Sequence, residues 1–379
     1  MIRCIACDHT LERTSGRSAT AALACSAATL LLLVPANLCT FLTTNAFGVF
    51  RHSVVASSAI AMLDDGWPLL AIVIFLFAVL FPVLRFAMLT TVLESLRRGR
   101  EDRWLGPVFR YATMLETWAM PDVFLLGLAV AYFRLAAAIS VDLGIGAYCY
   151  ILAGILALFV RATLDKADIW ERIADTHAFA PGTPLIGCIA CEQIHPAPAE
   201  GTRCARCGKR LHARKFNSIG RTVALTLAAA ILYFPANIYP LATLPIGFQP
   251  TRYTVLEGVI DLFHANLYGL ALLVLTASFA IPILKLVGIG WCVSSVIRRS
   301  RKRLVAKTRV YRTVEEIGRW SMVDPFVIGC FTPVMHYNAL IYGRAEAAAV
   351  PFTAVVILTI IGAKTFDPRL MWDAAGRAQ

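Results

Sequence analysis

The stretch "VPANLCTF" at residues 34–41 returns 200 residues later as "FPANIYPL" at residues 234–241. Recurrence of this kind marks a duplicated unit, which is the first pattern to establish in a sequence because it decides the whole fold. The chain is therefore predicted to contain two tandem copies of one unit. Three more pairs of blocks stand 200 or 202 residues apart: "CIAC" (4–7) and "CARC" (204–207), "FPVLRF" (81–86) and "IPILKL" (281–286), "WAMPDVFLLG" (118–127) and "WSMVDPFVIG" (320–329).

Each predicted copy is rich in membrane-length apolar segments. Hydrophobic residues make up 58% of the 379 residues, whereas soluble domains have about 45–50%. A run of about 20 apolar residues crosses a hydrocarbon core of roughly 30 Å. We predict an all-α polytopic membrane protein with eight transmembrane helices in two tandem four-helix repeats. The expected spans are residues 20–44, 67–94, 113–136, 145–163, 219–243, 263–296, 320–342 and 348–365.

Basic residues predict the orientation of these spans. Arg and Lys are concentrated in segments 97–110, 203–215 and 297–312, whereas 45–66 and 244–262 contain one Arg each. Cytoplasmic loops carry the excess of Lys and Arg, so both termini and the Cys-rich insert are predicted to be cytoplasmic. Four spans per copy then make the repeat parallel. The formal charge of +12 is explained by this topology and does not indicate a nucleic-acid partner.

A polar insert separates the two copies. Residues 166–216 are expected to form a cytoplasmic linker and a small zinc-ribbon-like domain between a first repeat at 20–165 and a second at 217–366. Residues 1–19 are expected to form a partial N-terminal Cys knuckle, and residues 367–379 a cytoplasmic tail.

The insert carries four cysteines in two pairs, Cys188, Cys191, Cys204 and Cys207, with twelve residues between the pairs. Two Cys-x-x-Cys turns supply the four thiolates of a tetrahedral zinc site, and a domain this small needs a metal to fold. We expect a structural Zn2+; iron in a rubredoxin-like site stays open. Permanent disulfides are not expected in a reducing cytoplasm. His195 and His212 are expected to face solvent, because four thiols already fill the site.

Cys4 and Cys7 form an incomplete counterpart near the N-terminus. Their distance along the chain from the next predicted span matches that of Cys204 and Cys207, whereas their sequence, "CIAC", matches that of Cys188 and Cys191. Two thiolates make a poor zinc site. Three explanations of this pair stay open: it is a vestige, it is a partial site completed by ligands from elsewhere, or it is the remainder of a longer segment.

Ionisable residues inside predicted spans are candidates for a lipid or polar pathway, because they are costly there unless paired or hydrated. Arg85 and Lys285 follow a proline by three residues at the same place in each copy. The alternative is that both side chains extend along tilted helices to the inner interface. Asp122 and Asp324 recur beside the Trp-containing blocks, where they pair with a cation or cap a helix, and we favour the cap.

Two other groups of residues complete the candidate pathway. Glu257, Asp261 and His264 line an outward-facing mouth or are plain loop residues, and we favour the loop. Prolines interrupt four apolar runs and free carbonyls that need other partners. The expected helix kinks lie at Pro35, Pro82, Pro235 and Pro282.

Segments 204–241, 315–326 and 365–373 closely resemble the paraquat-inducible protein A family of Gram-negative inner-membrane proteins. Pro325, where an aliphatic residue is usual, and the incomplete N-terminal knuckle depart from that pattern. The resemblance implies a multi-pass protein of the bacterial inner membrane, with zinc on Cys188, Cys191, Cys204 and Cys207. It also implies a periplasmic MCE-domain partner and the transfer of phospholipid between the two membranes, in support of envelope integrity.

Three functions remain in competition. Lipid transport is the first interpretation, a membrane redox or stress-defence protein that uses its Cys-x-x-Cys pairs is the second, and a non-transporting anchor for a periplasmic partner is the third. The sequence contains no Walker, G-x-S-x-G, H-E-x-x-H or Rossmann pattern, each of which would indicate an enzyme. The chain is therefore not expected to be an enzyme.

Overall fold

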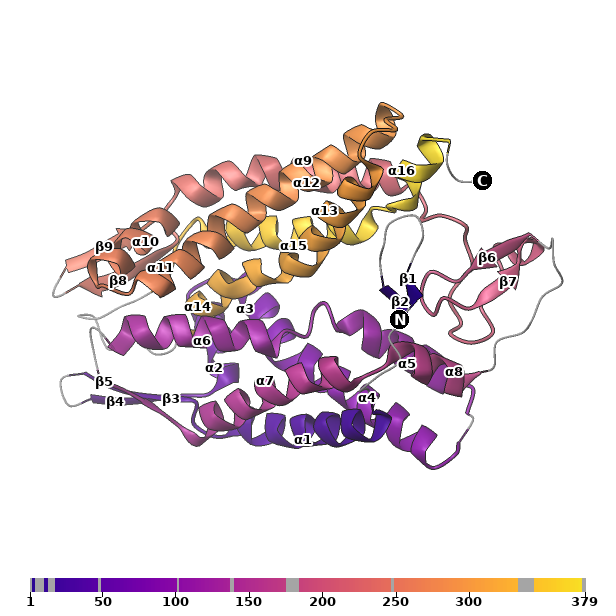
Figure 1. The fold of residues 1–379 in the computed structure, drawn as a ribbon. Coiled ribbons are helices and arrows are strands. Elements are labelled where there is room, and N and C mark those ends of the chain that lie inside the picture. Colours follow the sequence, from indigo (N-terminus) through magenta and orange to yellow (C-terminus); the bar gives the residue numbers. More distant parts are fainter. Residues whose placement is uncertain are drawn as a thin grey trace.

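The computed structural model is mostly helical, and both ends of its long axis carry short strands (Figure 1). Cys4 and Cys7 lie outside the described residues, so their contribution to a metal site stays a prediction. The structure describes residues 2–3, 10–12, 18–46, 49–100, 102–136, 140–174, 184–246, 249–332 and 344–376.

The first half of the chain forms a bundle in which the first and last long helices, α1 and α7, pack against each other. Its elements are α1 (Ala19–Leu38), β3 (Leu42–Ala46), β4 (Val49–Ser53), α2 (Val55–Asp64), α3 (Pro68–Phe75), the π-helical η1 (Leu76–Leu80), α4 (Phe81–Arg97), α5 (Leu105–Leu115), α6 (Pro121–Ala136), β5 (Ser140–Leu143), α7 (Ile145–Thr163) and α8 (Lys166–Ile173).

The second half repeats this order, with α9 packed against α15, and adds one 3-10 turn. A short segment joins the halves and contains β6 (Leu185–Gly187), β7 (Ile194–Pro196) and the 3-10 turn η2 (Ala197–Ala199); β1 (Ile2–Arg3) and β2 (Thr10–Glu12) pair near the N-terminus. The second-half elements are α9 (Ser218–Ile238), β8 (Ala242–Ile246), β9 (Gln249–Tyr253), α10 (Val255–His264), α11 (Tyr268–Leu275), η3 (Thr276–Ala280), α12 (Ile281–Ile297), α13 (Leu304–Ile317), η4 (Gly318–Met322), α14 (Val323–Phe331), β10 (Arg344–Ala345), α15 (Ala349–Thr365) and α16 (Arg369–Ala374).

The prolines explain a feature that both halves share. Pro82 and Pro282 each follow a π-helical turn, η1 or η3, and enter the next helix at its first turn. A proline cannot donate to the carbonyl four residues before it. The Tyr150 hydroxyl donates to the carbonyl of Ala78 at 3.1 Å, so the group left without a partner by Pro82 is satisfied. The helical run therefore continues through each proline as one apolar stretch of 30 residues.

The other two prolines, Pro35 and Pro235, lie in the last turns of α1 and α9. One side chain reinforces each of these turns: the Asn37 amide donates to the carbonyl of Leu33 at 2.7 Å, and the Asn237 amide donates to its equivalent at 2.8 Å. The repeated "PAN" sequence therefore encodes the same helix end twice.

Five helical stretches are long and apolar enough to cross a membrane: 19–38, 68–97, 145–163, 218–238 and 268–297. They coincide with five of the eight predicted spans. The other three segments are shorter or interrupted in the structure. Segment 113–136 divides between α5 and α6, the helix of 348–365 starts at Ala349, and 320–342 begins with the turn η4 and extends beyond the described residues.

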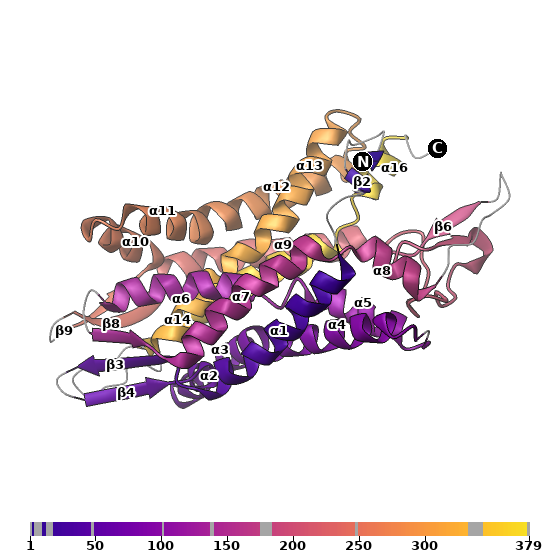
Figure 2. The same ribbon diagram turned by 60° about the horizontal axis from the view of Figure 1, so that its bottom comes forward.

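Two small antiparallel sheets were not predicted. Their strand orders are β4-β3-β5 and β10-β8-β9, so each half carries a hairpin joined by a third strand from before its last long helix. The predicted spans 20–44 and 219–243 were therefore too long, because α1 and α9 end at Leu38 and Ile238 and the chain continues into strands. Both hairpins lie at the end of the molecule opposite β6 and the C-terminus (Figures 1 and 2).

The two halves meet along α6 and α14. Phe124 and Phe326, which are equivalent in the duplication, contact each other with ring centroids 5.3 Å apart. A Cβ atom at Gly127 would lie 2.9 Å from the Cβ of Phe326, so the glycine permits this close approach. Equivalent helices thus pack against each other at the junction, as in an isologous interface.

Candidate metal centre and buried charge clusters

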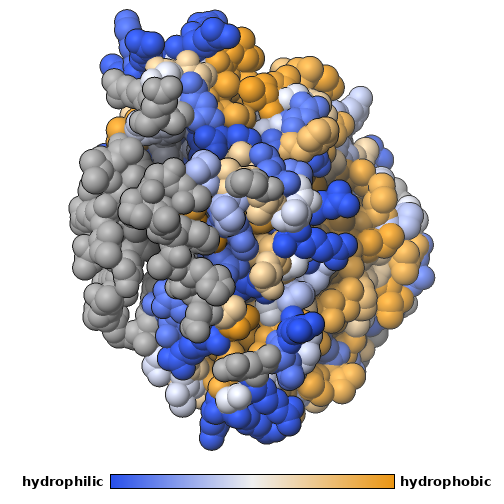
Figure 3. All heavy atoms as spheres, turned by 90° about the vertical axis from the view of Figure 1, so that its right-hand side faces the viewer, coloured by the Kyte–Doolittle hydropathy of each residue, from blue (hydrophilic) through white to orange (hydrophobic). Residues whose placement is uncertain are grey.

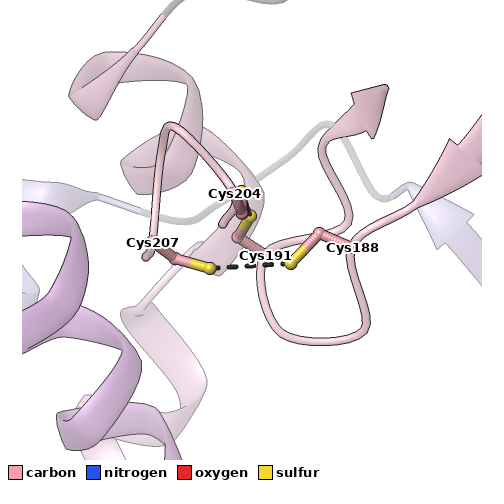
Figure 4. A group of neighbouring side chains, drawn as sticks. All are labelled: Cys188, Cys191, Cys204 and Cys207. Atoms are coloured by element: carbon pink, nitrogen blue, oxygen red, sulfur yellow. Dashed lines mark hydrogen bonds between the residues drawn. The ribbon is translucent and has the colours of Figure 1, made fainter. Parts of the chain in front are cut away.

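The four cysteines of the insert gather at one point between β6 and α9 (Figure 4). The Sγ atoms of Cys188 and Cys207 are 3.5 Å apart, as are those of Cys191 and Cys204, and all four lie within 4.8 Å of one another. Ligands at about 2.3 Å from a tetrahedral ion are separated by roughly 3.8 Å. The four side chains are at most 3% exposed. This donor set fits a tetrahedral metal ion such as zinc.

Two similar turns build the centre. The amide of Glu192 donates to the carbonyl of Cys188 at 3.0 Å, and the amide of Gly208 donates to that of Cys204 at 2.8 Å. Both residues after the pairs adopt positive φ, 59° at Glu192 and 70° at Gly208. Gly adopts this conformation freely, whereas other residues are strained there. The first turn therefore carries a strain that the second avoids.

The thiols cannot all ionise together unless a cation is present. Contact with Cys191, and less strongly the Ala190 amide, lowers the pKa of Cys188 to about 6. The pKa of Cys204 is also lowered, chiefly by Cys188, whereas contact with Cys188 raises the pKa of Cys191 and of Cys207. Neighbouring thiolates repel one another, and a bound divalent ion removes that opposition. His195 is partly buried, with its Nε2 3.4 Å from the Cys204 sulfur, whereas His212 is exposed as expected. Neither histidine belongs to the cluster of four ligands.

The Cys-rich segment 184–211, named here the Cys module, docks on α5 of the first half. Arg110 donates from Nη1 to the carbonyl of Cys207 at 2.9 Å. A Cβ atom at Gly106 would lie only 1.7 Å from the carbonyl oxygen of Arg206, so α5 accepts the module only because residue 106 has no side chain. The Arg206 guanidinium is buried and donates to the carbonyl of Ala174.

The next residues tie the module to the second half. Arg214 and Asp373 form a two-pronged ion pair, with Nε to Oδ2 at 2.6 Å and Nη2 to Oδ1 at 2.8 Å. This contact raises the pKa of Arg214. The Lys215 ammonium donates to the carbonyls of Lys364 and Phe366 at 2.8 and 2.9 Å. The module therefore contacts α5 of one half, and its linker contacts the end of the other.

Arg85 lies inside the first half, where its side chain is 2% exposed. Its guanidinium lies 3.8 Å from the carboxylate of Glu116, which Lys166 also contacts at 2.6 Å. Glu116 precedes the break between α5 and α6. The signal for it was present in the sequence, because it is an ionisable residue within predicted span 113–136.

Asp122 holds the two halves together. Its Oδ2 accepts from Arg161 of the first half at 3.2 Å and from Arg319 of the second half at 2.8 Å. Asp122 is buried, and carboxylates bridged by two guanidinium groups form strong charge-assisted contacts. The structure therefore shows Asp122 paired with cations, which was the less favoured of its two predicted roles. Sequence reasoning did not single out Arg161 or Arg319.

The second half has a different arrangement around Lys285. This side chain is 1% exposed and donates to the Thr359 hydroxyl at 3.2 Å. Gly318 stands where the first copy has Glu116, two residues before the repeated Trp, and a Cβ atom there would lie 3.0 Å from Lys285 Cε. No ion pair of Lys285 is found among the described residues. Asp324 accepts a hydrogen bond from Ser278.

Glu257, Asp261 and His264 are not loop residues, because they lie exposed on α10. Glu257 and Thr254 form a capping box: the Thr254 amide donates to the Glu257 carboxylate at 2.7 Å, and the Glu257 amide donates to the Thr254 hydroxyl at 3.3 Å. Thr followed three residues later by Glu is a sequence signature of a helix start, which the sequence interpretation missed. The assignment of these residues to an outward-facing mouth stays a prediction.

Known proteins resemble this chain over most of its length. It is 30% identical over 355 residues to the intermembrane transport protein PqiA of Escherichia coli, covering 91% of this chain and 84% of that protein. It is 29% identical over 277 residues to the lipophilic envelope-spanning tunnel protein A of the same organism, covering 71% of this chain and 63% of that one. A probable intermembrane transport protein of Haemophilus influenzae is 24% identical over 391 residues, which cover 99% of this chain and 91% of that protein.

No solved structure matches the chain. The model of the paraquat-inducible protein A family matches twice, at residues 19–174 and 219–376, with the Cys module between the two matches. These ranges correspond to the two bundles that repeat the same order of elements. The chain belongs to the paraquat-inducible protein A family.

Proposed function

We propose that this protein is a multi-pass inner-membrane component of a lipid transport system, and that it passes phospholipid between the inner membrane and a periplasmic MCE-domain partner. The match to proteins named for intermembrane transport over 91% of the chain carries the proposal. In this arrangement eight helices span the membrane as two four-helix repeats. The Cys module, both termini and the basic loops face the cytoplasm, and the hairpins β3–β4 and β8–β9 face the periplasm.

The buried charges support a polar pathway. Arg85 and Lys285 both point into the bundles, and an ionisable group in a membrane interior is retained where it serves substrates or ions. Lys285 is the stronger candidate. The only hydrogen bond of its ammonium among the described residues is to the Thr359 hydroxyl, so the ammonium can still pair with a phosphate. We assign Arg85, with Glu116, to holding the first bundle.

The Cys module serves as a structural clasp in this proposal, with Cys188, Cys191, Cys204 and Cys207 holding one Zn2+ and no redox cycle. Its four sulfurs are buried, whereas a redox-active pair presents an accessible thiolate. Purified protein is expected to contain one metal per chain and no thiol that cycles with glutathione. Recovery of stoichiometric iron or of a reducible disulfide would favour the redox alternative.

Complementation tests the transport role. In cells that lack the gene, wild type should restore the envelope barrier to detergents, and Lys285→Met should fail at equal protein level in the membrane. Arg299→Gln, an exposed charge change in the loop after α12, is the matched control and should complement fully. Normal barrier function in a Lys285→Met, Arg85→Met double variant would reject the pathway assignment. Full complementation by a chain that no longer captures lipid would favour the anchor interpretation.

A further inference from the structure

A basic cavity lies where the Cys module, α5 and the end of α15 meet. Its volume is about 640 Å3. None of the described residues that line it is acidic. Figure 3, which looks onto this end of the molecule, shows hydrophilic side chains spread over it and hydrophobic side chains at its margins. The cations of the cavity are Arg110, Arg203, Lys209, Arg210, Lys215 and Lys364.

Backbone pairing forces two of these cations together. Arg203 and Arg210 are opposite each other in an antiparallel bridge, so their side chains leave the same face at close range. Like charges at such positions repel. Neither has an ion-pair partner among the described residues. Lys364 contacts Glu315 at 3.8 Å across an exposed edge. The cavity therefore holds an excess of positive charge that an anion would neutralise.

The walls of the cavity show which anion fits. Two apolar side chains of α5, Tyr111 and Met114, line the cavity and are 50% and 61% exposed. Lys364 belongs to the last turn of α15, and Arg110 lies three residues before the start of predicted span 113–136. In the proposed topology this is the depth of lipid headgroups. Charge beside exposed apolar surface suits an amphiphile, whereas free phosphate needs only the charge.

We propose that this cavity binds the phosphate group of an anionic phospholipid from the cytoplasmic leaflet, with the acyl chains leaving past Tyr111 and Met114. The site rests on the proposed transport function and adds to it a headgroup preference and a place of entry. It also gives the Cys module a second task, because three of the six cations (Arg203, Lys209 and Arg210) belong to it.

Photocapture tests this site without any transport. The full chain, with its metal and with a benzoylphenylalanine at Met114, is placed in nanodiscs of phosphatidylglycerol and phosphatidylcholine. We expect capture to favour phosphatidylglycerol. A variant with Arg203→Gln, Lys209→Gln and Arg210→Gln should capture about tenfold less phosphatidylglycerol, since each basic residue attracts anionic lipid. A probe at Leu31, exposed on α1, should capture both lipids in proportion to their amounts.

Matched variants make the result decisive. Arg298→Gln, Arg299→Gln, Lys302→Gln removes three exposed charges at the same end outside the cavity and should leave capture unchanged. Lys364→Gln removes a cavity cation without touching the Cys module, and should lower capture even if the triple variant loses its metal. The proposed site would be overturned if capture did not depend on the headgroup, or if neither cavity variant lowered it.

Inorganic phosphate distinguishes the source of the anion. Phosphate at millimolar concentration should not displace the lipid, and full displacement would make free phosphate the ligand and overturn the lipid assignment. Because capture is measured without a partner protein, a failed site with an intact envelope barrier would leave the transport proposal standing. Normal capture with no contribution to the barrier would reject transport alone.

Discussion

Arg85 and Lys285 occupy equivalent places in two bundles of the same element order, yet their surroundings differ. Arg85 faces the carboxylate of Glu116, which Lys166 also contacts. Lys285 faces Gly318, the residue that replaces Glu116 in the second copy, and donates to a hydroxyl. The first half thus contains a paired charge, and the second a buried cation without a carboxylate among the described residues. The two halves thus share their order of elements, whereas their buried charges have diverged.

Asp122 and Asp324 offer the strongest test of this difference. Asp122→Asn should lower the free energy of unfolding by about 3–5 kcal/mol, because it leaves two buried guanidinium groups without their shared carboxylate. Asp324→Asn, which weakens a hydrogen bond from Ser278, should cost about 1–2 kcal/mol. Thermal unfolding in detergent measures both. Equal losses of unfolding free energy would show that the two aspartates contribute equally to stability, and the contrast between the halves would disappear.

Gly106 tests whether the Cys module belongs to the first half. Gly106→Ala would place a Cβ against the carbonyl of Arg206, and overpacking of this kind costs about 3 kcal/mol. Limited proteolysis between α8 and α9 should accelerate while the metal content stays the same. Gly290→Ala on α12, where the added Cβ meets no atom within 4 Å, is the control. An unchanged rate of cleavage in Gly106→Ala would mean that docking on α5 is dispensable.

Replacing each of the two buried cations, Arg85 and Lys285, by methionine tests how they differ. Arg85→Met should destabilise the protein by about 2 kcal/mol, since it removes the buried partner of Glu116. Lys285→Met should be neutral or stabilising by about 1 kcal/mol, because a desolvated charge is replaced by an apolar side chain of similar length. Melting temperatures of the purified variants check this. A destabilised Lys285→Met would mean that the lysine has a structural role after all.

The smallest expected effect compares the two turns of the metal centre. Glu192→Gly should raise stability against metal release by about 0.5–1 kcal/mol, because glycine accepts the positive φ at this position. Gly208→Ala in the second turn should cost about 1 kcal/mol for the opposite reason. Release of the metal on heating, followed with a chromogenic chelator, reports both changes. If the two substitutions shift release in the same direction, backbone strain does not distinguish the turns.

The limits of the sequence appear at particular residues. Apolar length identified the five long helices, because burial in lipid demands about 20 apolar residues whatever the neighbours are. It misjudged the ends of α1 and α9, after which residues 42–46 pair with 49–53 and residues 242–246 pair with 249–253. Glu116, Arg161 and Arg319 were not singled out, since their importance depends on which charges lie opposite them.

The sequence by itself determined the duplication, the apolar helices and the two Cys-x-x-Cys turns. Each of these is a local pattern: a repeated block, a run of apolar residues, or two thiols separated by two residues. Only the tertiary structure decided that Asp122 joins the halves, that Lys285 lies opposite a glycine, and that cations from the Cys module, α5 and α15 surround one cavity. These features depend on contacts between residues far apart in the sequence, such as Asp122 and Arg319, which are 197 positions apart. Folding alone brings such groups within reach of each other.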